Sequence, residues 1–437
     1  ESRGLGDVYK RQATKYMGAD ETVFHKIDKD FHTEFIGYDK LEGDSEISFI
    51  TTDDELIENA KAGDEVYIVS SQTPFYAESG GQVGDIGTIV TESGKCRVVD
   101  TQKVVAGKFA HKAVVEEGEI AVGQKAHFTV DRKTRYAVMR NHSCAHLLQA
   151  ALRKVLGEHV HQAGQLVDAH RLRFDFSHFN AMTAEEKLKV EALVNKYILE
   201  ALDIKMEEMP IAEAQKLGAM ALFGEKYGDK VRVVSMGDFS KELCGGTHVK
   251  NTAEIGLFKL VSEAGVAAGV RRIEALTGPS VTAYYKAQEE KMHEAAALLK
   301  TTPADLLEKI AHLQAEAKAL QAENESLKSK LSKEALGDVM DKVTEVKGVK
   351  LLAASVPDVD MNGLRDLGDQ LKEKLGSGVV VLASAKDGKV SLLAMVTDDA
   401  MKKGAHAGKL IKEVAAVVGG GGGGPVSYTH LRAHEPP

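Results

Sequence analysis

The chain has 437 residues, 43% of them hydrophobic, and a formal net charge of −9. This length leaves room for roughly two to four domains with their own cores. The acidic balance argues against non-specific nucleic-acid binding through bulk charge. No run approaches the roughly 18 consecutive apolar residues of a membrane span, and we expect no signal peptide, because residues 1–12 are polar. Three scattered cysteines indicate a reducing compartment, so we expect a cytoplasmic protein.

Both ends of the chain differ in pattern from the rest. Residues 1–12 and 425–437 have no periodicity that continues into the neighbouring sequence. We interpret both as non-native tails of the cloning-adapter type and leave them out of fold prediction. The sequence between them is expected to be an internal piece of a longer protein.

Residues 13–130 are predicted to form a small β-barrel or sandwich. Short β-rich runs such as Val66–Val69 and Cys96–Val99 are separated by Gly, Asp and Ser, and Ala126–Val130 alternates strictly. Residues 73–85 (TPFYAESGGQVGD) form a loop between strands that contains aromatic residues, a glutamate and a Gly-Gly turn. This loop is either a tight corner with a hydrogen-bonded carboxylate or the lining of a neighbouring site.

Residues 131–279 are predicted to form an α+β domain. A helical pattern runs from about Asp131 to Leu156, and a second amphipathic helix from Ala184 to Leu202. Short strands lie between and after these helices, and the strand Lys230–Ser235 leads toward a glycine turn.

Two pairs of metal-binding side chains lie in this domain. His142 and His146 are four residues apart on the first helix, so both imidazoles leave the same face one turn apart. Cys244 and His248 flank a Gly-Gly pair, whose missing Cβ atoms let the backbone bend sharply. Three imidazoles and a thiolate suit Zn²⁺. Neither pair is specific by itself, but together they predict a zinc site. The alternative to a functional zinc is one that only stabilises the fold.

Residues 280–345 are rich in glutamate and lysine and are predicted to form a helical arm. Apolar residues recur with 4-3-4-3 spacing between 306 and 331, with the single polar residue Asn324 at an a position. This row of apolar residues, the seam, can pack against another helix in a hairpin, against a second subunit, or against its own domain. Residues 346–424 then alternate strands and helices, and they end in the glycine run Gly419–Gly424.

Five motifs follow one another in the α+β domain: His142–His146 (HSCAH), Ala219–Tyr227 (AMALFGEKY), Met236–Phe239 (MGDF), Glu242–His248 (ELCGGTH) and Gly269–Glu274 (GVRRIE). In this order they resemble the editing domain of the alanyl-tRNA synthetase family. The loop 75–85 matches the barrel module that precedes this domain in the family, and residues 346–424 resemble its carboxyl-terminal DHHA1-type module. The resemblance covers about residues 13–424.

The resemblance implies that the chain is the part of an alanine-tRNA ligase that edits mischarged tRNA. The family joins alanine to its tRNA with ATP in a class II catalytic domain, which we expect to be absent here. It also hydrolyses seryl- or glycyl-tRNA(Ala) made in error. An alanine pocket discriminates against serine or glycine by only about 1–3 kcal/mol, so a second, hydrolytic site is needed.

The resemblance also implies roles for individual residues. His142, His146, Cys244 and His248 are the zinc ligands, and zinc either positions the substrate or activates a water. Four protein ligands close the coordination shell, which favours positioning with His248 as the loosest ligand. The candidate catalytic or substrate-contacting residues are Gln162, Ala145, Gly245, Gly246, Thr247, Glu78, Gln82 and Asp175. The family commonly has threonine where this chain has Ala145.

Basic residues near the site are expected to hold the acceptor end of tRNA(Ala) by its phosphates. The candidates are Arg140, Arg173, Arg271 and Arg272. In the family the glycine loop after residue 419 continues through Arg-Pro-Asp, but here only Pro425 remains, which weakens the prediction of RNA binding there. The family also favours a homodimer through residues 306–331.

The expected fold is α+β and multidomain, with a small β-barrel, a zinc-containing editing domain, a coiled-coil arm and a truncated α/β DHHA1-like domain. The alternative function is a tRNA-binding or dimerisation fragment that has a structural zinc and no activity of its own.

Overall fold

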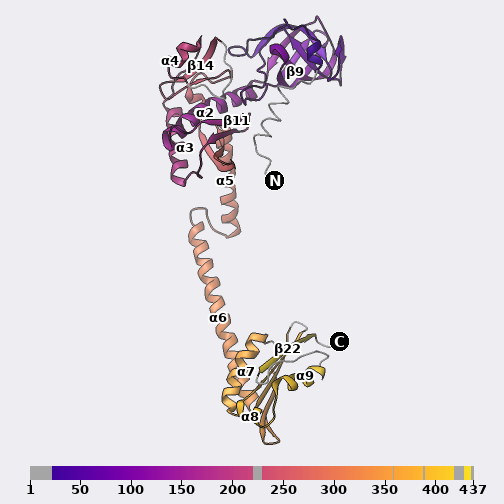
Figure 1. Ribbon diagram of the computed structural model, residues 1–437, viewed down its shortest axis with the longest axis vertical. Coiled ribbons are helices and arrows are strands. Elements are labelled where there is room, and N and C mark those ends of the chain that lie inside the picture. The colour runs from indigo at the N-terminus through magenta and orange to yellow at the C-terminus, as the bar shows by residue number, and fades with distance from the viewer. Residues whose placement is uncertain (1–21, 220–228, 358, 387–388, 418–427, 435–437) are drawn as a thin grey trace. The chain divides into compact units, whose positions relative to one another are not determined.

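The computed structural model describes residues 22–219, 229–357, 359–386, 389–417 and 428–434. Two compact units divide the chain, residues 1–292 and 293–437 (Figure 1). The motif Ala219–Tyr227 and the glycine run Gly419–Gly424 lie almost entirely outside the described residues. Among the helices that are described, none is both long and apolar enough to cross a membrane.

The first unit begins with a closed antiparallel barrel, as predicted. Strand β10 (Lys125–Val130) pairs with both β7 (Gly87–Thr91) and β2 (Glu42–Thr51), so the path β10-β7-β8-β9-β5-β2 returns to its start. The other elements are η1 (Val23–Lys26), β1 (Glu34–Phe35), β3 (Leu56–Ile57), β4 (Asn59–Lys61), β5 (Glu65–Ser70), β6 (Gln72–Thr73), β8 (Gly94–Val104), η2 (Val105–Gly107) and β9 (Lys108–Ala121).

The barrel encloses an apolar core because alternate residues along each strand point inward. Ile47, Ile68, Ile89 and Phe128 are fully buried in this core. The loop 73–85 joins β6 to β7, the position that the sequence predicts.

The α+β part of the first unit is built around the long helix α2 (Arg132–Leu156). Asp131 caps its start by accepting a hydrogen bond from the Thr134 amide, and Gly157 ends it. The helix packs against a four-stranded antiparallel sheet with the order β11-β12-β17-β16. These strands are β11 (Gln162–Val167), β12 (Leu172–Ser177), β16 (Phe258–Ala267) and β17 (Val270–Thr277).

A second, three-stranded sheet carries the cysteine turn. Its order is β13-β14-β15, and residues 244–248 follow its last strand directly. The strands are β13 (Ile204–Pro210), β14 (Lys230–Met236) and β15 (Ser240–Leu243); the remaining elements are α3 (Ala184–Leu199), α4 (Ile211–Lys216) and η3 (Thr252–Ile255). Helix α3 ends three residues before the predicted Leu202, because Ala201 has a left-handed φ of 51° that a helix cannot contain.

The predicted helical arm consists of two helices. Helix α5 (Pro279–Leu298) ends before Lys300, whose φ is 52°, and α6 (Leu306–Met340) begins after Pro303. A left-handed residue followed closely by a proline stops the first helix. The arm is also shorter than predicted, since Val343–Val346 forms strand β18 and turns at Lys347 and Gly348 into the next strand.

The second unit contains a five-stranded sheet with the order β18-β19-β20-β21-β22. One core cluster lies between this sheet and helix α7, where Leu364 and Leu371 are buried, and a second includes Ile411 of helix α9. The elements are β18 (Val343–Val346), β19 (Val349–Ser355), α7 (Met361–Leu375), β20 (Val379–Lys386), β21 (Lys389–Val396), α8 (Asp398–Lys402), α9 (Ala407–Val417) and β22 (Tyr428–His434). The alternation of strands and helices is the predicted one.

Part of the segment 425–437, which was left out of the fold prediction, forms a strand of this sheet. Tyr428–His434 forms β22 and pairs antiparallel with β21 from Lys389 to Met395. Pairing with the edge of a sheet uses backbone N–H and C=O groups, so it does not need the hydrophobic pattern on which the sequence analysis relied.

Candidate metal centre

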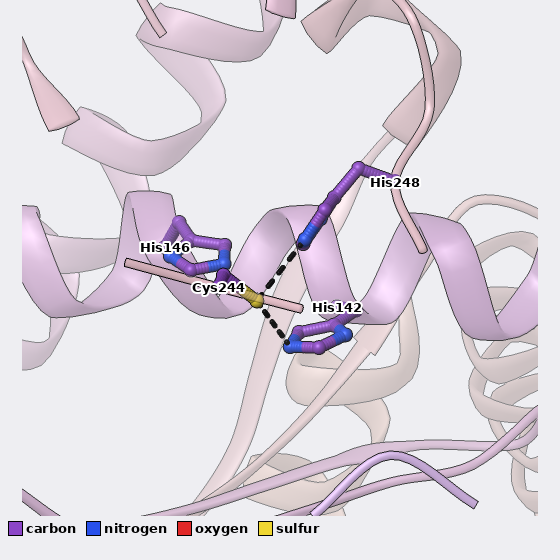
Figure 2. Close-up of side chains that lie close together, drawn as sticks. All are labelled: His142, His146, Cys244 and His248. Atoms are coloured by element: carbon purple, nitrogen blue, oxygen red, sulfur yellow. Dashed lines mark hydrogen bonds between the residues drawn. The ribbon is translucent and has the colours of Figure 1, made fainter. Parts of the chain in front are cut away.

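The structure brings the two predicted ligand pairs together at one point. His142, His146, Cys244 and His248 offer four ligand atoms that all lie within 4.8 Å of one another. Figure 2 shows the two helical imidazoles side by side on α2, with the Cys244 sulfur and the His248 ring approaching them from the turn after β15. The cluster could therefore hold a metal ion.

The distances within the cluster suit a shared ion. The Cys244 Sγ lies 3.6 Å from Nε2 of His142 and 3.3 Å from Nε2 of His248. The His146 Nε2 is buried and has no hydrogen-bond partner among the described residues. A buried, unpartnered nitrogen is costly in an apolar interior, and a bound metal would remove that cost.

Two of the histidines bind carbonyl or carboxylate oxygens through their other ring nitrogen. Nδ1 of His142 lies 2.7 Å from Oε1 of Gln82, and Nδ1 of His146 donates to the carboxylate of Glu242. Because these oxygens can only accept hydrogen bonds, each ring carries a proton on Nδ1, and its Nε2 faces the cluster. Metal-binding histidines typically have such partners, so this arrangement fits a metal ion.

The third histidine has a weaker partner. Nδ1 of His248 lies 3.2 Å from the hydroxyl of Ser143, and that hydroxyl oxygen also accepts a hydrogen bond from the Val249 amide. The Ser143 Oγ already accepts a hydrogen bond from the Val249 amide. It therefore bonds to His248 either by donating its own proton or by accepting through its second lone pair. The orientation of His248 is therefore less strictly fixed than that of His142 or His146.

The local electrostatics favour a thiolate. Burial raises the pKa of the Cys244 thiol, but the neighbouring imidazoles of His142 and His248 outweigh burial and hold this pKa well below its usual value. Burial lowers the pKa of His248 to about 3, so its ring is neutral. Burial also lowers the pKa of His146, but the carboxylate of Glu242 more than offsets this and raises it to about 10. Thiolate and neutral imidazole are the forms that bind metal, so binding at His146 would release a proton from its ring.

The glycine turn between the ligands is required for a different reason from the one expected. Neither Gly245 nor Gly246 has a left-handed φ, so sharp bending is not what selects glycine here. A Cβ on Gly246 would lie 2.1 Å from Cε1 of His142 and 2.9 Å from Oε1 of Gln82. Gly246 is needed because the backbone touches a ligand ring, whereas a Cβ on Gly245 would meet nothing within 4 Å.

The carbonyl groups of this turn are held from outside the cluster. Arg232 donates from Nη1 to the carbonyl oxygens of Cys244 and Gly246 at 3.0 and 2.9 Å. The hydroxyl of Tyr38 donates to the carbonyl of Gly245 at 2.8 Å, and the Arg232 guanidinium lies 4.1 Å above the Tyr38 ring. Tyr38 belongs to the barrel, so residues from both parts of the first unit hold the turn.

Of the predicted loop residues, Gln82 lies at the cluster and also bonds to the turn. Its Nε2 donates to the hydroxyl of Thr247 at 2.9 Å, and its Oε1 accepts from the Thr247 amide at 2.9 Å. The structure thereby brings Gln82 and Thr247 together. The backbone amide of Glu78 donates to the Thr101 carbonyl of the barrel.

Gln162 and Asp175 lie on opposite faces of the four-stranded sheet. Gln162 pairs with Phe176, whose side chain packs in the core with α2. The Nε2 of Gln162 is buried without a hydrogen-bond partner among the described residues. Asp175 lies between Phe174 and Phe176 along its strand, so its side chain leaves the other face. Ala145 packs in the same apolar core as Phe174.

Two of the four predicted RNA-binding arginines are paired with carboxylates. Arg272 forms a two-bond ion pair with Asp175 at 2.6 and 2.7 Å, and Arg271 pairs with the buried Glu263. Nε of Arg173 is buried without a hydrogen-bond partner among the residues described. Arg140 is half-buried, and burial lowers its pKa below the usual arginine value.

Sequence reasoning missed several residues that support the cluster. Ser143 is next to His142, and Glu242 is two residues before Cys244. Their spacing from these ligands alone could have indicated that they support the cluster. Arg232, Tyr38 and Gln165 gave no such signal. Gln165 lies on β11 with its Nε2 2.7 Å from the Gly80 carbonyl and 3.4 Å from Nε2 of His142.

Three family models match parts of the chain. The model of class II (A) tRNA synthetases matches residues 7–134, and the model of the threonyl and alanyl tRNA synthetase second additional domain matches residues 231–274. The DHHA1 domain model matches residues 348–427. The second match contains Cys244 and His248 of the cluster.

Curated relatives extend the similarity to nearly the whole chain. Alanine–tRNA ligase 1 of Lachnoclostridium phytofermentans is 56% identical over 95% of this chain and 47% of that protein. The alanine–tRNA ligase of Acetivibrio thermocellus is 50% identical over 92% of this chain and 46% of that protein. The solved C-Ala domain of Aquifex aeolicus alanyl-tRNA synthetase matches 22% of this chain and 85% of that one, at 28% identity and a TM-score of 0.21.

The chain thus spans about half the length of the curated relatives that it matches. The three family models follow one another along the chain in the order class II (A) tRNA synthetase, second additional domain and DHHA1. The chain belongs to the alanyl-tRNA synthetase family.

Proposed function

We propose that this chain is part of an alanine-tRNA ligase and that this part hydrolyses Ser-tRNA(Ala) or Gly-tRNA(Ala) made in error. The observation that carries the proposal is the cluster of His142, His146, Cys244 and His248, with its ligand atoms within 4.8 Å. Two of these residues, Cys244 and His248, lie in the part of the chain that matches the second additional domain, and the relatives are alanine–tRNA ligases.

The proposed cofactor is Zn²⁺. Three imidazole nitrogens and a thiolate form a typical zinc ligand set, and the outward Nδ1 contacts of His142 and His146 favour a metal at the inner nitrogens. A bound zinc would supply a Lewis acid that attracts a polar group of the substrate. Four protein ligands leave no open position, so we favour a role in positioning the substrate.

Among the four ligands, His248 is the one that a substrate group could displace from the metal most easily. Its outer contact, to the Ser143 hydroxyl at 3.2 Å, is longer than the 2.7 Å contact of His142 to Gln82. A neutral hydroxyl also binds an imidazole N–H less strongly than a carboxylate such as Glu242 does. This difference supports His248 as the ligand that a serine hydroxyl or amino group would replace.

Discrimination against alanine requires polar groups around the substrate side chain. Gln162 has a buried amide nitrogen without a partner among the described residues, and Gln165 lies beside His142. A buried donor that binds the serine hydroxyl would be left unpaired by alanine, which is the strongest form of discrimination available to such a site. Ala145 has no hydroxyl to add to this set.

The proposed partner is the acceptor end of tRNA(Ala). Since Arg271 and Arg272 are paired with Glu263 and Asp175, their net charge toward a phosphate is reduced. Arg140 and Arg173 have no carboxylate within ion-pair distance in the part of the chain that is described, so they are the better candidates for phosphate contacts.

The test is deacylation of Ser-tRNA(Ala) by the zinc-loaded chain, with Ala-tRNA(Ala) as the competing substrate. We expect rapid loss of serine, slower loss of alanine, and loss of both activities in Cys244→Ala. Cys96→Ala, a matched change at a buried cysteine in the barrel core, should keep the activity. Intact Ser-tRNA(Ala) after incubation with folded, zinc-loaded protein would contradict the proposal.

A second candidate function is dimerisation, in which the zinc is structural. It is favoured by the leucines of α6, because Leu320 and Leu327 are 58% and 51% exposed although they belong to an apolar seam. Apolar side chains in a regular seam are typical of a helix that pairs with another helix. A chain that dimerises but deacylates nothing would support this function over the first.

A further inference from the structure

We propose that Gln82, which the barrel loop supplies, is a positioning residue of the metal centre. It fixes the direction of the His142 ring and the conformation of the turn that carries Cys244 and His248. This inference rests on the proposed metal site but not on the proposed hydrolysis. It makes the barrel a structural part of the metal centre.

Gln82 joins the two halves of the cluster through one side chain. Its Oε1 accepts from Nδ1 of His142 at 2.7 Å and from the amide of Thr247 at 2.9 Å, and its Nε2 donates to the Thr247 hydroxyl at 2.9 Å. The side chain is fully buried, so water does not compete for these bonds. One ligand comes from α2 and the turn from the end of β15, and Gln82 bonds to both.

The three bonds leave only one orientation for the amide. The Thr247 backbone N–H can only donate, so the atom 2.9 Å from it must be the oxygen of Gln82 and not its nitrogen. That same oxygen accepts from His142, which therefore carries its proton on Nδ1. In the neutral ring, Nε2 of His142 then has no proton, and it faces the Cys244 sulfur at 3.6 Å.

The loop that carries Gln82 is fixed to the α+β part by its backbone. The amide of Val83 donates to the carbonyl of Val167 at 3.1 Å, and the amide of Val167 donates to the carbonyl of Gly81 at 2.7 Å. Gly81 has a left-handed φ of 83°, and a Cβ there would lie 2.5 Å from the Gln165 carbonyl oxygen. The loop thus continues the edge of the sheet at β11, which only glycine at position 81 allows.

A buried ion pair fixes the other end of the loop. Nε of Arg135 donates to Asp85 at 2.9 Å, while the Tyr76 amide donates to the same carboxylate at 2.6 Å. Arg135 belongs to α2, two turns before His142, so the helix that carries the ligand also holds the loop. Both ends of the segment 81–85 are therefore anchored, and Gln82 lies between the anchors.

The test compares zinc affinity in three variants of the full chain. Gln82→Met has a similar volume but makes none of the three bonds, and we expect a zinc dissociation constant about 10–100 times larger. Gln82→Glu keeps an oxygen that accepts from His142 and Thr247, and the Thr247 hydroxyl can donate to it. This variant should bind zinc within about threefold of the original chain. Gln72→Met is the matched control, since Gln72 bonds to Glu34 in the barrel.

Two further readouts separate positioning from a general loss of stability. With Co²⁺ in place of zinc, the thiolate-to-metal and d–d absorption bands of Gln82→Met should shift or lose intensity, while those of Gln82→Glu and Gln72→Met should not. The rise in melting temperature that metal produces should shrink in Gln82→Met alone. A merely structural glutamine would lower the melting temperature of metal-free and metal-bound protein equally.

The outcomes are distinct. Equal zinc affinity and an unchanged cobalt spectrum in Gln82→Met would overturn the role of Gln82. If Gln82→Met does not fold, Gln82→Asn decides: its shorter side chain withdraws the amide, so unchanged affinity there would overturn the inference too. Failure of the original chain to bind any metal would instead refute the proposed metal site, and failure to deacylate tRNA would leave the affinities of these variants unaffected.

Discussion

The backbone of Gly246 lies directly against the imidazole of His142. A Cβ on Gly246 would be 2.1 Å from Cε1 and 2.4 Å from Nδ1 of that ring, distances that no packed side chain tolerates. The ring cannot move away easily, because Gln82 holds its Nδ1. The close contact makes the turn and the ligand a single rigid arrangement.

Gly246→Ala is therefore expected to abolish tight metal binding. The added methyl group displaces either the His142 ring or the turn with Cys244 and His248, so the four ligand atoms no longer converge. Gly245→Ala is the matched control, since its Cβ would meet nothing within 4 Å. Zinc titration should show affinity lost in the first variant and kept in the second, and equal affinities in the two would contradict this account of the turn.

Arg135→Met is expected to destabilise the first unit strongly. Arg135 is 1% exposed, forms an ion pair with Asp85, and donates to the carbonyls of Gly37 and Pro74 at 2.7 and 2.8 Å. Removing it leaves a buried carboxylate without its cation, which costs about 3–5 kcal/mol.

Urea unfolding monitored by circular dichroism measures this loss. Arg132→Met, a change of the same kind on the exposed first turn of the same helix, should alter the free energy of unfolding by less than about 0.5 kcal/mol. Equal effects of the two substitutions would show that the buried ion pair does not hold the barrel loop.

The barrel should lose stability as the pH falls from about 6.5 toward 4, because of His111. This ring is fully buried: Nδ1 donates to the Ile68 carbonyl at 2.7 Å, and Nε2 accepts from the Thr73 hydroxyl at 2.8 Å. Burial lowers its pKa from 6.5 to about 4. Below pH 6.5 the unfolded chain binds a proton that the folded chain does not, so stability falls with pH, by about 2 kcal/mol at pH 5.

Hydrogen exchange of the amides in β9, at pH 7 and pH 5, measures this loss after correction for intrinsic rates. His111→Gln cannot take up the proton, so its stability should change less between the two pH values than that of the original chain. The same pH dependence in both proteins would rule out His111 as its source.

The exposed seam on α6 predicts a homodimer through residues 306–331. Leu320→Lys places a charge in the seam and should convert dimers to monomers in sedimentation experiments. Ala319→Lys changes the adjacent exposed position outside the seam and should leave the dimer intact. Sedimentation of the original chain as a monomer at all concentrations, or a dimer that survives Leu320→Lys, would refute the seam as an interface.

Local patterns were sufficient to predict the elements that position the ligands. The period of the helix placed His142 and His146 on one face of α2, and alternation identified the barrel strands. Each of these signals lies within one segment of the chain. The helix break at Lys300 and the end of α3 at Ala201 were missed, because left-handed residues that are not glycine leave little trace in a sequence.

Contacts between distant segments could not be predicted in the same way. The bond from Gln82 to Thr247 spans 165 residues, and Tyr38 lies 207 residues from Gly245. These contacts depend on how the barrel packs against α2, which no local pattern encodes. Strand β22 was also missed, because an edge strand needs only backbone hydrogen bonds.

X-ray absorption spectroscopy of the zinc-loaded chain tests the central claim most directly. The four ligands predict one zinc per chain with three nitrogen neighbours at about 2.0 Å and one sulfur at about 2.3 Å. Cys244→Ala should remove the sulfur neighbour, and Cys96→Ala should not. A zinc with no sulfur neighbour, or no stoichiometric zinc in folded protein, would contradict the assignment of His142, His146, Cys244 and His248 as its ligands.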